Sequence, residues 1–306
     1  MNEDLLYLKY RPKNFEDVLG QTEAINTLIK KLKVNKVPHA LLFHGPYGTG
    51  KTTLARILAK ELNCLKDDFS EKNTADYRGI DSVRDIRRIM NQSPMYGDVK
   101  VWLLDEAHMM TSQAFNALLK PLEDTPKHVY FMLATTELEK IPTGVRQRCL
   151  PIKLNPVSEK YIGHILLHIC KKEKIKVSKT VLQKIVKYSG GSPREAIQIL
   201  DRIYLLDDEQ EQLEAVVKSS VQTQTIEIAR LLIRNQTRWR DIAPILKELR
   251  EEDVEPIRQM ILSYATSVLV KSDNARAFRI IEAFRDNFFD CRFSGVVAGC
   301  YEVLSE

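Results

Sequence analysis

Short apolar runs alternate with segments of helical periodicity through the first half of the chain. The runs lie at residues 39–43, 99–105, 129–136 and 150–154. Apolar strands separated by helices are typical of a parallel β-sheet whose faces are covered by helices. We therefore expect an α/β domain built on a parallel sheet over residues 1–156.

One stretch of this half, residues 65–79, departs from the pattern. It is short and polar at a place where a further core strand would be expected. Strands that are buried on both faces are rich in apolar residues. The pattern therefore predicts a sheet that is trimmed at this point.

Strand-like alternation stops after Asn155–Pro156. Three amphipathic segments follow, at about 158–173, 178–189 and 192–206. Ser178 precedes the second segment as an N-cap residue, and Ser192–Pro193 supplies a cap and a first-turn proline to the third. We expect a small helical domain over residues 157–207.

Helical periodicity continues beyond the charged segment Asp207–Glu211 without strand-like alternation. We expect a third, all-helical domain over residues 208–306. A chain of 306 residues exceeds the usual range of a single domain, so several domains with separate cores agree with its length.

The composition narrows the class of protein. Hydrophobic residues make up 44% and charged residues 28%, which is ordinary for a soluble globular protein and excludes extensive disorder. The 46 Lys and Arg residues against 41 Asp and Glu residues give a net charge of +5. That charge permits contact with nucleic acid without predicting it.

The cysteines and the apolar runs indicate the compartment. The five cysteines never approach a C-x-x-C spacing, which argues against a disulfide framework or a zinc ribbon and favours buried thiols in a reducing compartment. The N-terminal segment has no apolar signal core, and no run reaches the roughly 18 to 20 apolar residues of a membrane span. We expect an intracellular, cytoplasmic protein with no membrane partner.

A phosphate-binding motif follows the first apolar run. Residues 45–52 match G-x-x-x-x-G-K-[ST] and stand before a helical segment, the context that indicates a P-loop. In a P-loop, backbone N–H groups surround phosphate oxygens, the lysine reaches the β- and γ-phosphates, and the Thr hydroxyl binds Mg²⁺. The residues expected to bind phosphate are Gly45, Pro46, Tyr47, Gly48, Thr49, Gly50, Lys51, Thr52 and Thr53.

An acidic pair, Asp105 and Glu106, ends the next apolar run. Ligands of open α/β sheets bind at the carboxyl ends of the strands. There Asp105 can hold Mg²⁺ through water, with Thr52 as a second metal ligand. Glu106 can orient or deprotonate the water that attacks the γ-phosphate, and Lys51 completes the catalytic set. The pair predicts a nucleoside triphosphatase rather than a protein that only binds nucleotide.

The same pair begins the string Asp-Glu-Ala-His, which a class of helicases shares. That class needs a second RecA-like motor domain, and 306 residues leave no room for one. We therefore disfavour a helicase and interpret His108 as a loop residue.

Further motifs resemble AAA+ clamp-loader ATPases of the replication factor C small-subunit and bacterial DNA polymerase III gamma/tau type. The resemblance spans about residues 5–206. The motifs that carry it are Tyr10-Arg11-Pro12, Phe15, Val18-Leu19-Gly20-Gln21, Asn116–Glu123, Leu133–Thr136, Arg146–Cys149 and Gly191–Ala196. The resemblance implies a RecA-like AAA+ sheet domain, a three-helix lid and a helical collar that joins subunits into an open pentameric ring. It also implies that the chain, together with other loader subunits, uses ATP to open a sliding clamp and place it on primer-template DNA during replication.

The resemblance assigns roles around the ATP. The segment implied to fold over the adenine contains Tyr10, Arg11, Pro12, Val18 and Leu19. Thr136 is the implied γ-phosphate sensor, since a hydroxyl can bond to phosphate or to the attacking water. Arg194, in the first turn of a lid helix, is the implied second sensor.

Arg148 resembles the arginine of a Ser-Arg-Cys motif that reaches into the ATP site of the neighbouring subunit. A guanidinium is always charged and binds two phosphate oxygens at once, so such an arginine in trans makes hydrolysis depend on assembly. Gln147 stands where the family usually has Ser, and Arg146 lies close by. Which arginine reaches the phosphate therefore stays open.

A basic segment resembles the helix that follows the DNA template in these loaders. Its candidate DNA-binding residues are Arg78, Arg84, Arg87 and Arg88. Contacts of this kind neutralise backbone phosphates, so binding should be independent of sequence and sensitive to salt. The alternative is a solvated basic face.

The chain also departs from the bacterial gamma subunit. That subunit carries a zinc module with four cysteines after the P-loop helix, whereas only Cys64 stands here. The pattern is therefore closer to the replication factor C type or to a phage-encoded loader. Two other functions remain open: an AAA+ DNA motor for branch migration, and a loader scaffold that binds nucleotide without hydrolysing it.

Overall fold

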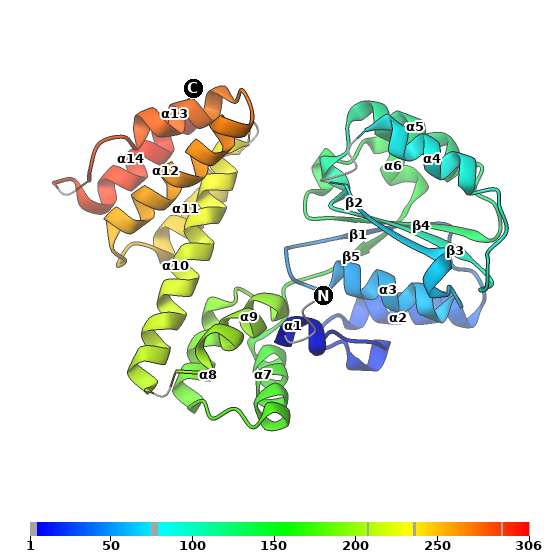
Figure 1. The fold of residues 1–306 in the computed structure, drawn as a ribbon, viewed down its shortest axis with the longest axis horizontal. Helices are drawn as coiled ribbons and strands as arrows, with labels where there is room; N and C mark the ends of the chain where they lie inside the picture. The colour runs from blue at the N-terminus through cyan, green and yellow to red at the C-terminus, as the bar shows by residue number, and fades with distance from the viewer. Residues whose placement is uncertain (1–4, 75–78, 207, 235–236, 289, 306) are drawn as a thin grey trace. The chain divides into compact units, whose positions relative to one another are not determined.

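The computed structural model describes residues 5–74, 79–206, 208–234, 237–288 and 290–305 (Figure 1). The chain divides into two compact units, Met1–Tyr204 and Leu205–Glu306. Each unit has its own hydrophobic core. The P-loop and the acidic pair lie in the first unit.

A parallel sheet organises the first unit. Its strands have the order β2-β3-β4-β1-β5, and every neighbouring pair is parallel. The strands are β1 (Ala40–His44), β2 (Phe69–Asn73), β3 (Lys100–Asp105), β4 (Val129–Thr135) and β5 (Leu150–Lys153). The α/β prediction is confirmed, and four of these strands coincide with the predicted apolar runs.

The prediction of a trimmed sheet is wrong, because the polar stretch forms β2 at the edge of the sheet. Phe69 pairs with Val101 and Asn73 with Asp105 on β3. Glu71 receives two hydrogen bonds from the Arg56 guanidinium, each of 2.7 Å. Because an edge strand is only half buried and often carries charged residues, apolar alternation is absent and the sequence pattern does not reveal it.

The carboxylate of Asp68 joins the start of β2 to the loop before β3. It accepts hydrogen bonds from the backbone N–H groups of Met95, Tyr96 and Gly97 at 2.6, 3.0 and 3.0 Å. Burial alone would raise the pKa of Asp68, but these N–H groups outweigh it and hold the pKa below its usual value. The ionised carboxylate therefore stabilises the fold.

We expect Asp68→Ala to lower the free energy of unfolding by about 2 to 3 kcal/mol, because three N–H groups lose a charged acceptor. Since the pKa of Asp68 is lower in the folded state than in the unfolded state, the stabilisation is present above about pH 4 and disappears as the pH falls through the folded-state pKa. Denaturant unfolding at several pH values measures it. Asp67→Ala, at the exposed neighbouring residue, is the matched control; equal losses at both positions would contradict the prediction.

Helices cover both faces of the sheet (Figure 1). On one face lie α2 (Thr22–Lys33) and α3 (Lys51–Glu61). On the other lie α4 (Ile80–Ile89), α5 (Ser112–Glu123) and α6 (Thr143–Arg148). Strand residues alternate between the two cores, as the period of a strand requires: Leu41 and Phe43 face α3, whereas Leu42 faces α5.

Short helical turns lie in the connections and before α2. They are α1 (Leu6–Lys9), η1 (Phe15–Asp17), η2 (Lys66–Asp68), η3 (Ala107–Met109) and η4 (Leu138–Lys140). The turns η3 and η4 follow β3 and β4 directly, at the edge of the sheet where the P-loop also begins.

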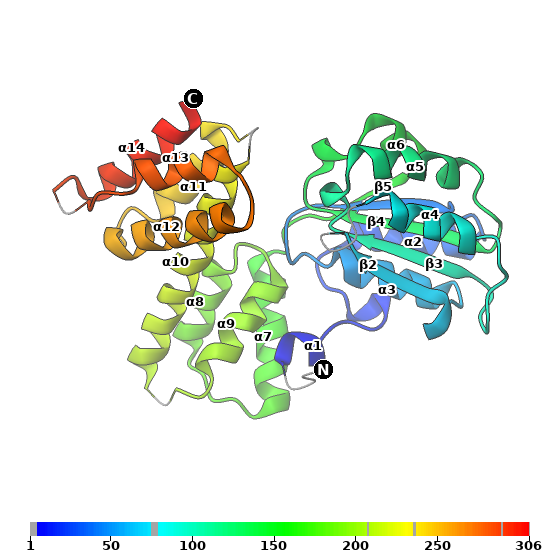
Figure 2. The same ribbon diagram turned by 45° about the horizontal axis from the view of Figure 1, so that its top comes forward.

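Three further helices complete the first unit: α7 (Glu159–Glu173), α8 (Lys179–Tyr188) and α9 (Pro193–Ile203) (Figure 2). Both predicted caps are confirmed. The Ser178 hydroxyl accepts from the N–H of Val181, and the Ser192 hydroxyl accepts from that of Glu195, each at 3.2 Å. Sequence reasoning located these helices well because their start signals are local.

Among the described residues of the second unit, helices are the regular secondary structure. Its helices are α10 (Glu209–Ile233), α11 (Trp239–Glu248), α12 (Val254–Lys271), α13 (Ala275–Ala283) and α14 (Arg292–Ser305). Phe284 is fully buried at the centre of its core. Within the described part of the chain, no helix has the length and apolar character needed to cross a membrane.

Candidate nucleotide-binding site

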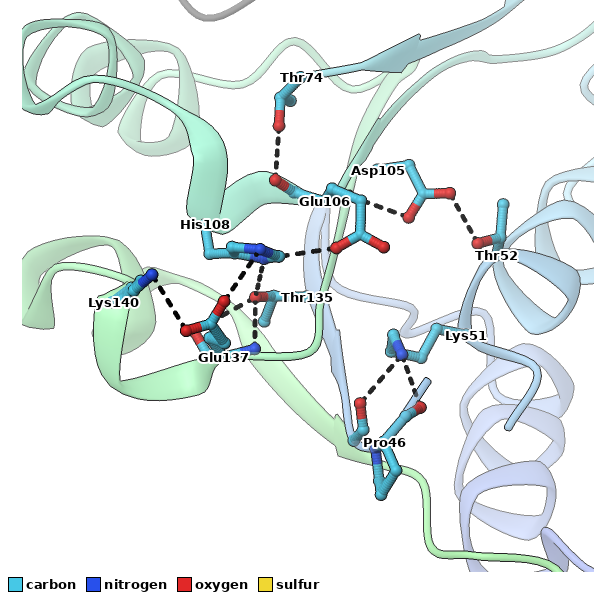
Figure 3. A network of polar contacts seen from close by, with 11 residues as sticks. Pro46, Lys51, Thr52, Thr74, Asp105, Glu106, His108, Thr135, Glu137 and Lys140 are labelled. Carbon is cyan, nitrogen blue, oxygen red and sulfur yellow. Dashed lines mark hydrogen bonds and ion pairs between the residues drawn. The ribbon is translucent and has the colours of Figure 1, made fainter. Parts of the chain in front are cut away.

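The P-loop connects β1 to the first residue of α3. Gly48 and Gly50 adopt φ values of +72° and +104°, a left-handed backbone that favours glycine. The Lys51 ammonium donates to the carbonyls of Gly45 and Pro46 at 2.9 and 2.8 Å (Figure 3). Burial lowers the pKa of Lys51, while the nearby carboxylates of Asp105 and Glu106 oppose that shift. The lysine therefore lies folded within the loop whose phosphate ligand it is expected to meet.

Two oxygen ligands of the predicted metal lie together. The Thr52 hydroxyl donates to Asp105 Oδ2 at 2.8 Å, and Asp105 Oδ1 accepts from the backbone N–H of Glu106 at 3.0 Å (Figure 3). A hydroxyl and a carboxylate are the hard oxygen donors that Mg²⁺ prefers. The residues present therefore fit a magnesium ion beside the P-loop.

A cleft of about 840 Å³ opens above the P-loop within the first unit. Most residues predicted to bind nucleotide line it: Tyr10, Arg11, Pro12, Val18, Leu19, Tyr47, Gly48, Thr49, Gly50, Lys51, Thr52, Thr53, Asp105, Glu106 and Arg194. Gly45 and Pro46 do not line the cleft and instead accept hydrogen bonds from Lys51. A cleft of this size has room for a nucleotide.

The N-terminal segment is tied to two walls of the cleft. Arg11 Nε donates to the hydroxyl of Thr53 on α3 at 3.1 Å. The Tyr10 hydroxyl donates to Glu173 on α7, whose carboxylate also lies 2.7 Å from Lys9 Nζ. Burial and the bond to Glu173 raise the pKa of Tyr10 to about 12. These contacts hold the segment, which the resemblance expects to cover the adenine, against α3 and α7.

Arg194 lies at the second position of α9, against two aromatic rings. Its guanidinium carbon is 5.0 Å from the ring centre of Tyr7 and 5.3 Å from that of Tyr47, within the range of cation–π attraction. Sequence reasoning missed Tyr7, because its ring meets Arg194 only through the fold and no motif contains it.

The P-loop and the start of α9 approach each other closely at Gly48. A Cβ atom on Gly48 would stand 2.0 Å from the Ser192 hydroxyl that caps α9. The absence of a side chain at Gly48 therefore lets α9, and Arg194 with it, lie against the phosphate loop.

Gly48→Ala should displace the Ser192 cap and strain a left-handed backbone, lowering the free energy of unfolding by about 2 kcal/mol. We expect ATP affinity to fall at least about tenfold, because α9 moves from the loop. Nucleotide titration and denaturant unfolding measure the two effects. Gly190→Ala, with φ +56° and no atom within 4 Å of the added Cβ, controls for backbone strain alone. Equal effects of both variants would refute the role of the close approach.

The predicted γ-phosphate sensor and trans-acting arginine lie outside the cleft lining. Thr136 follows β4 by one residue and is partly buried. Arg148 ends α6, where its Nε donates to Glu123 at 2.8 Å and its Nη1 to the carbonyl of Gly144 at 2.7 Å. Arg146 donates to the Thr143 hydroxyl at 3.3 Å. Neither arginine lines its own chain's nucleotide cleft.

Three of the predicted DNA-binding arginines lie on the exposed side of α4. Val83 and Ile86 of this helix are buried against the sheet, whereas Arg84, Arg87 and Arg88 are exposed. Arg88 pairs with Asp85 at 2.6 Å. A further DNA-binding candidate, Arg78, lies outside the described residues.

His108 is more than the loop residue that the sequence predicted. It lies in η3 with a side chain only 6% exposed, and its ring lies between Glu106 and Glu137 (Figure 3). Sequence reasoning missed Glu137 because that residue follows β4 and reaches the site through the pairing of strands.

Family comparisons agree with this geometry. Residues 20–78 and 69–158 match the family described as DNA polymerase III, delta subunit, and residues 164–205 match the RCF1/5-like AAA+ ATPase lid domain. DNA polymerase III subunit gamma of Buchnera aphidicola subsp. Schizaphis graminum is 37% identical over 222 residues, which cover 66% of this chain and 61% of that protein. Subunit tau of Escherichia coli K12 is 35% identical over 237 residues, or 71% of this chain and 37% of that protein. The chain thus spans less than two thirds of these relatives.

Solved structures share the fold. RuvB of Thermotoga maritima, a Holliday junction branch migration motor, matches with a TM-score of 0.56 and 22% identity over 73% of this chain and 78% of that one. A point variant of the same motor gives a TM-score of 0.57 at 21% identity, with the same coverage. With its P-loop, acidic pair and matching lid, the chain belongs to the family of AAA+ ATPase subunits that includes DNA polymerase III gamma and tau.

Proposed function

We propose that the chain is an ATP-hydrolysing clamp-loader subunit that opens a sliding clamp and places it on primer-template DNA. The observation that carries the proposal is the convergence of Lys51, Thr52, Asp105 and Glu106 in one cleft, with Thr52 and Asp105 in direct contact. The sequence identity of 37% and 35% to DNA polymerase III gamma and tau subunits supports clamp loading over other ATP-dependent functions.

Each residue at the P-loop has a distinct task. Lys51 leaves its carbonyl partners and binds the β- and γ-phosphate oxygens of ATP, while the N–H groups of the loop surround them. Thr52 and Asp105 would hold Mg²⁺, which neutralises charge that develops on the phosphates. Glu106 orients the attacking water and accepts its proton. Thr136 and Arg194 sense the γ-phosphate from the sheet and from the lid.

Assembly completes the active site. Arg148 of one subunit reaches the ATP of its neighbour, and the second unit acts as a collar in a ring of five subunits. Residues 1–156, 157–207 and 208–306 serve as ATPase domain, lid and collar. The exposed face of α4 with Arg84, Arg87 and Arg88 follows the template backbone. The complex acts in the cytoplasm at the replication fork.

The two rival functions have less support. The similarity to RuvB, at 21–22% identity, shows only that the two proteins share a fold. It gives no reason to prefer a branch-migration motor. A scaffold that binds nucleotide without turnover would need Lys51 but not Glu106, yet both line the cleft.

The ATPase rate of the purified chain and of its assembled complex tests the proposal, with and without primed DNA and a sliding clamp. We expect a low rate for the chain alone and a synergistic rise with DNA plus clamp. Stimulation by DNA alone, accompanied by strand exchange at junctions, would favour the motor. No turnover in any mixture would overturn the ATPase proposal.

A further inference from the structure

His108 lies between two carboxylates, and one of them belongs to Glu106, which lines the cleft (Figure 3). Its Nδ1 is 3.4 Å from Glu106 Oε2, and its Nε2 is 3.1 Å from Glu137 Oε1. The side chain of His108 is 6% exposed and that of Glu137 is 16% exposed. The ring is therefore held by protein groups and is largely screened from water.

The ring also contacts the two residues that flank Thr136, through Nδ1 to Thr135 and through Nε2 to Glu137. The fully buried Thr135 has its Oγ1 3.1 Å from His108 Nδ1, and the same oxygen accepts from the backbone N–H of Glu137 at 3.0 Å. Glu137 Oε2 lies 3.0 Å from Lys140 Nζ. His108 thus contacts the residue before and the residue after the proposed γ-phosphate sensor.

The backbone of Glu106 is fixed on both sides. Its N–H donates to Asp105, and its carbonyl accepts from the Thr74 hydroxyl at 2.6 Å. Its φ of +53° belongs to the left-handed region, which a residue with a side chain holds only when its surroundings impose it. Rotation about the side-chain bonds then sets where the carboxylate points, and His108 contacts that carboxylate.

We propose that His108 is a positioning residue that ties the direction of the Glu106 carboxylate to the segment Thr135–Glu137. Glu106 can orient water only in a limited range of directions. Through His108, that range depends on the conformation of the segment that carries Thr136. Sensing of the γ-phosphate and activation of water are thereby linked within one subunit. This inference rests on the proposed ATPase function.

His108→Ala tests the link in the assembled complex with primed DNA and clamp. We expect kcat to fall about 10- to 100-fold, as for residues that orient a catalytic group, with the Kd for ATP changed less than about threefold. His108→Asn keeps an amide near the position of Nδ1 and should recover part of the lost kcat.

Two further variants separate positioning from support of the fold. His39→Ala is the matched control, because its partly buried ring bonds to the Val129 carbonyl at 2.7 Å and stacks on Tyr130 at the opposite end of the sheet. It should lower the melting temperature without changing kcat. Glu137→Gln should lower kcat, and combining it with His108→Ala should add little, because both act through the same link.

The outcomes are distinct. A kcat for His108→Ala within twofold of the unsubstituted chain overturns the inference, as do parallel losses of kcat and ATP affinity or full additivity with Glu137→Gln. Absence of turnover by the unsubstituted chain in every mixture overturns the proposed ATPase function, and this inference with it.

Discussion

Glu106→Gln should lower the ATPase rate of the assembled complex by about 10²- to 10⁴-fold, the range expected when a general base is removed. The substitution keeps the shape of the side chain and the backbone bonds of Glu106 to Asp105 and Thr74. We therefore expect the Kd for ATP to change less than about twofold. Single-turnover hydrolysis and nucleotide titration measure the two quantities.

A control for charge is available nearby. Glu139→Gln removes a carboxylate from the exposed part of η4 and should leave kcat unchanged. If Glu106→Gln hydrolysed ATP at the full rate, another group would have to activate the water and the catalytic assignment would fail.

Most of the predictions that the sequence allowed rest on short local motifs. The P-loop and the acidic pair are short, and their spacing reflects direct chemical needs, so the sequence predicts Lys51, Thr52 and Asp105 at one site, and all three line one cleft. The lid helices were also found, because Ser178 and Ser192 act within one turn of their own helix. These signals do not depend on distant parts of the chain.

Contacts between distant segments were beyond the sequence pattern. His108 meets Glu137 because β3 and β4 pair side by side and end at the same edge. Arg194 meets Tyr7 and Tyr47 only after α9 packs against the N-terminal segment and the P-loop. Such contacts join residues with no fixed spacing, so no motif records them.

Arg148→Ala should lower the ATPase rate of the assembled complex by about 10³- to 10⁵-fold, the effect expected for an arginine that stabilises the transition state from a neighbouring subunit. In the isolated chain Arg148 pairs with Glu123 on α5. Partly exposed pairs of this kind contribute only about 0 to 1 kcal/mol, so the arginine can leave Glu123 for phosphate at small cost. ATP binding by each subunit should persist, which a nucleotide titration checks.

A mixing experiment distinguishes action in trans from action in cis. In an assembly where two copies of the chain are neighbours, Arg148→Ala subunits keep Glu106, and Glu106→Gln subunits keep Arg148. Each variant alone should be inactive, whereas a mixture should regain activity at interfaces that join one of each in the right order. If the mixture stays inactive, Arg148 does not act across the interface. If Arg146→Ala, rather than Arg148→Ala, abolishes hydrolysis, Arg146 supplies the guanidinium, since the two arginines lie on the same short helix.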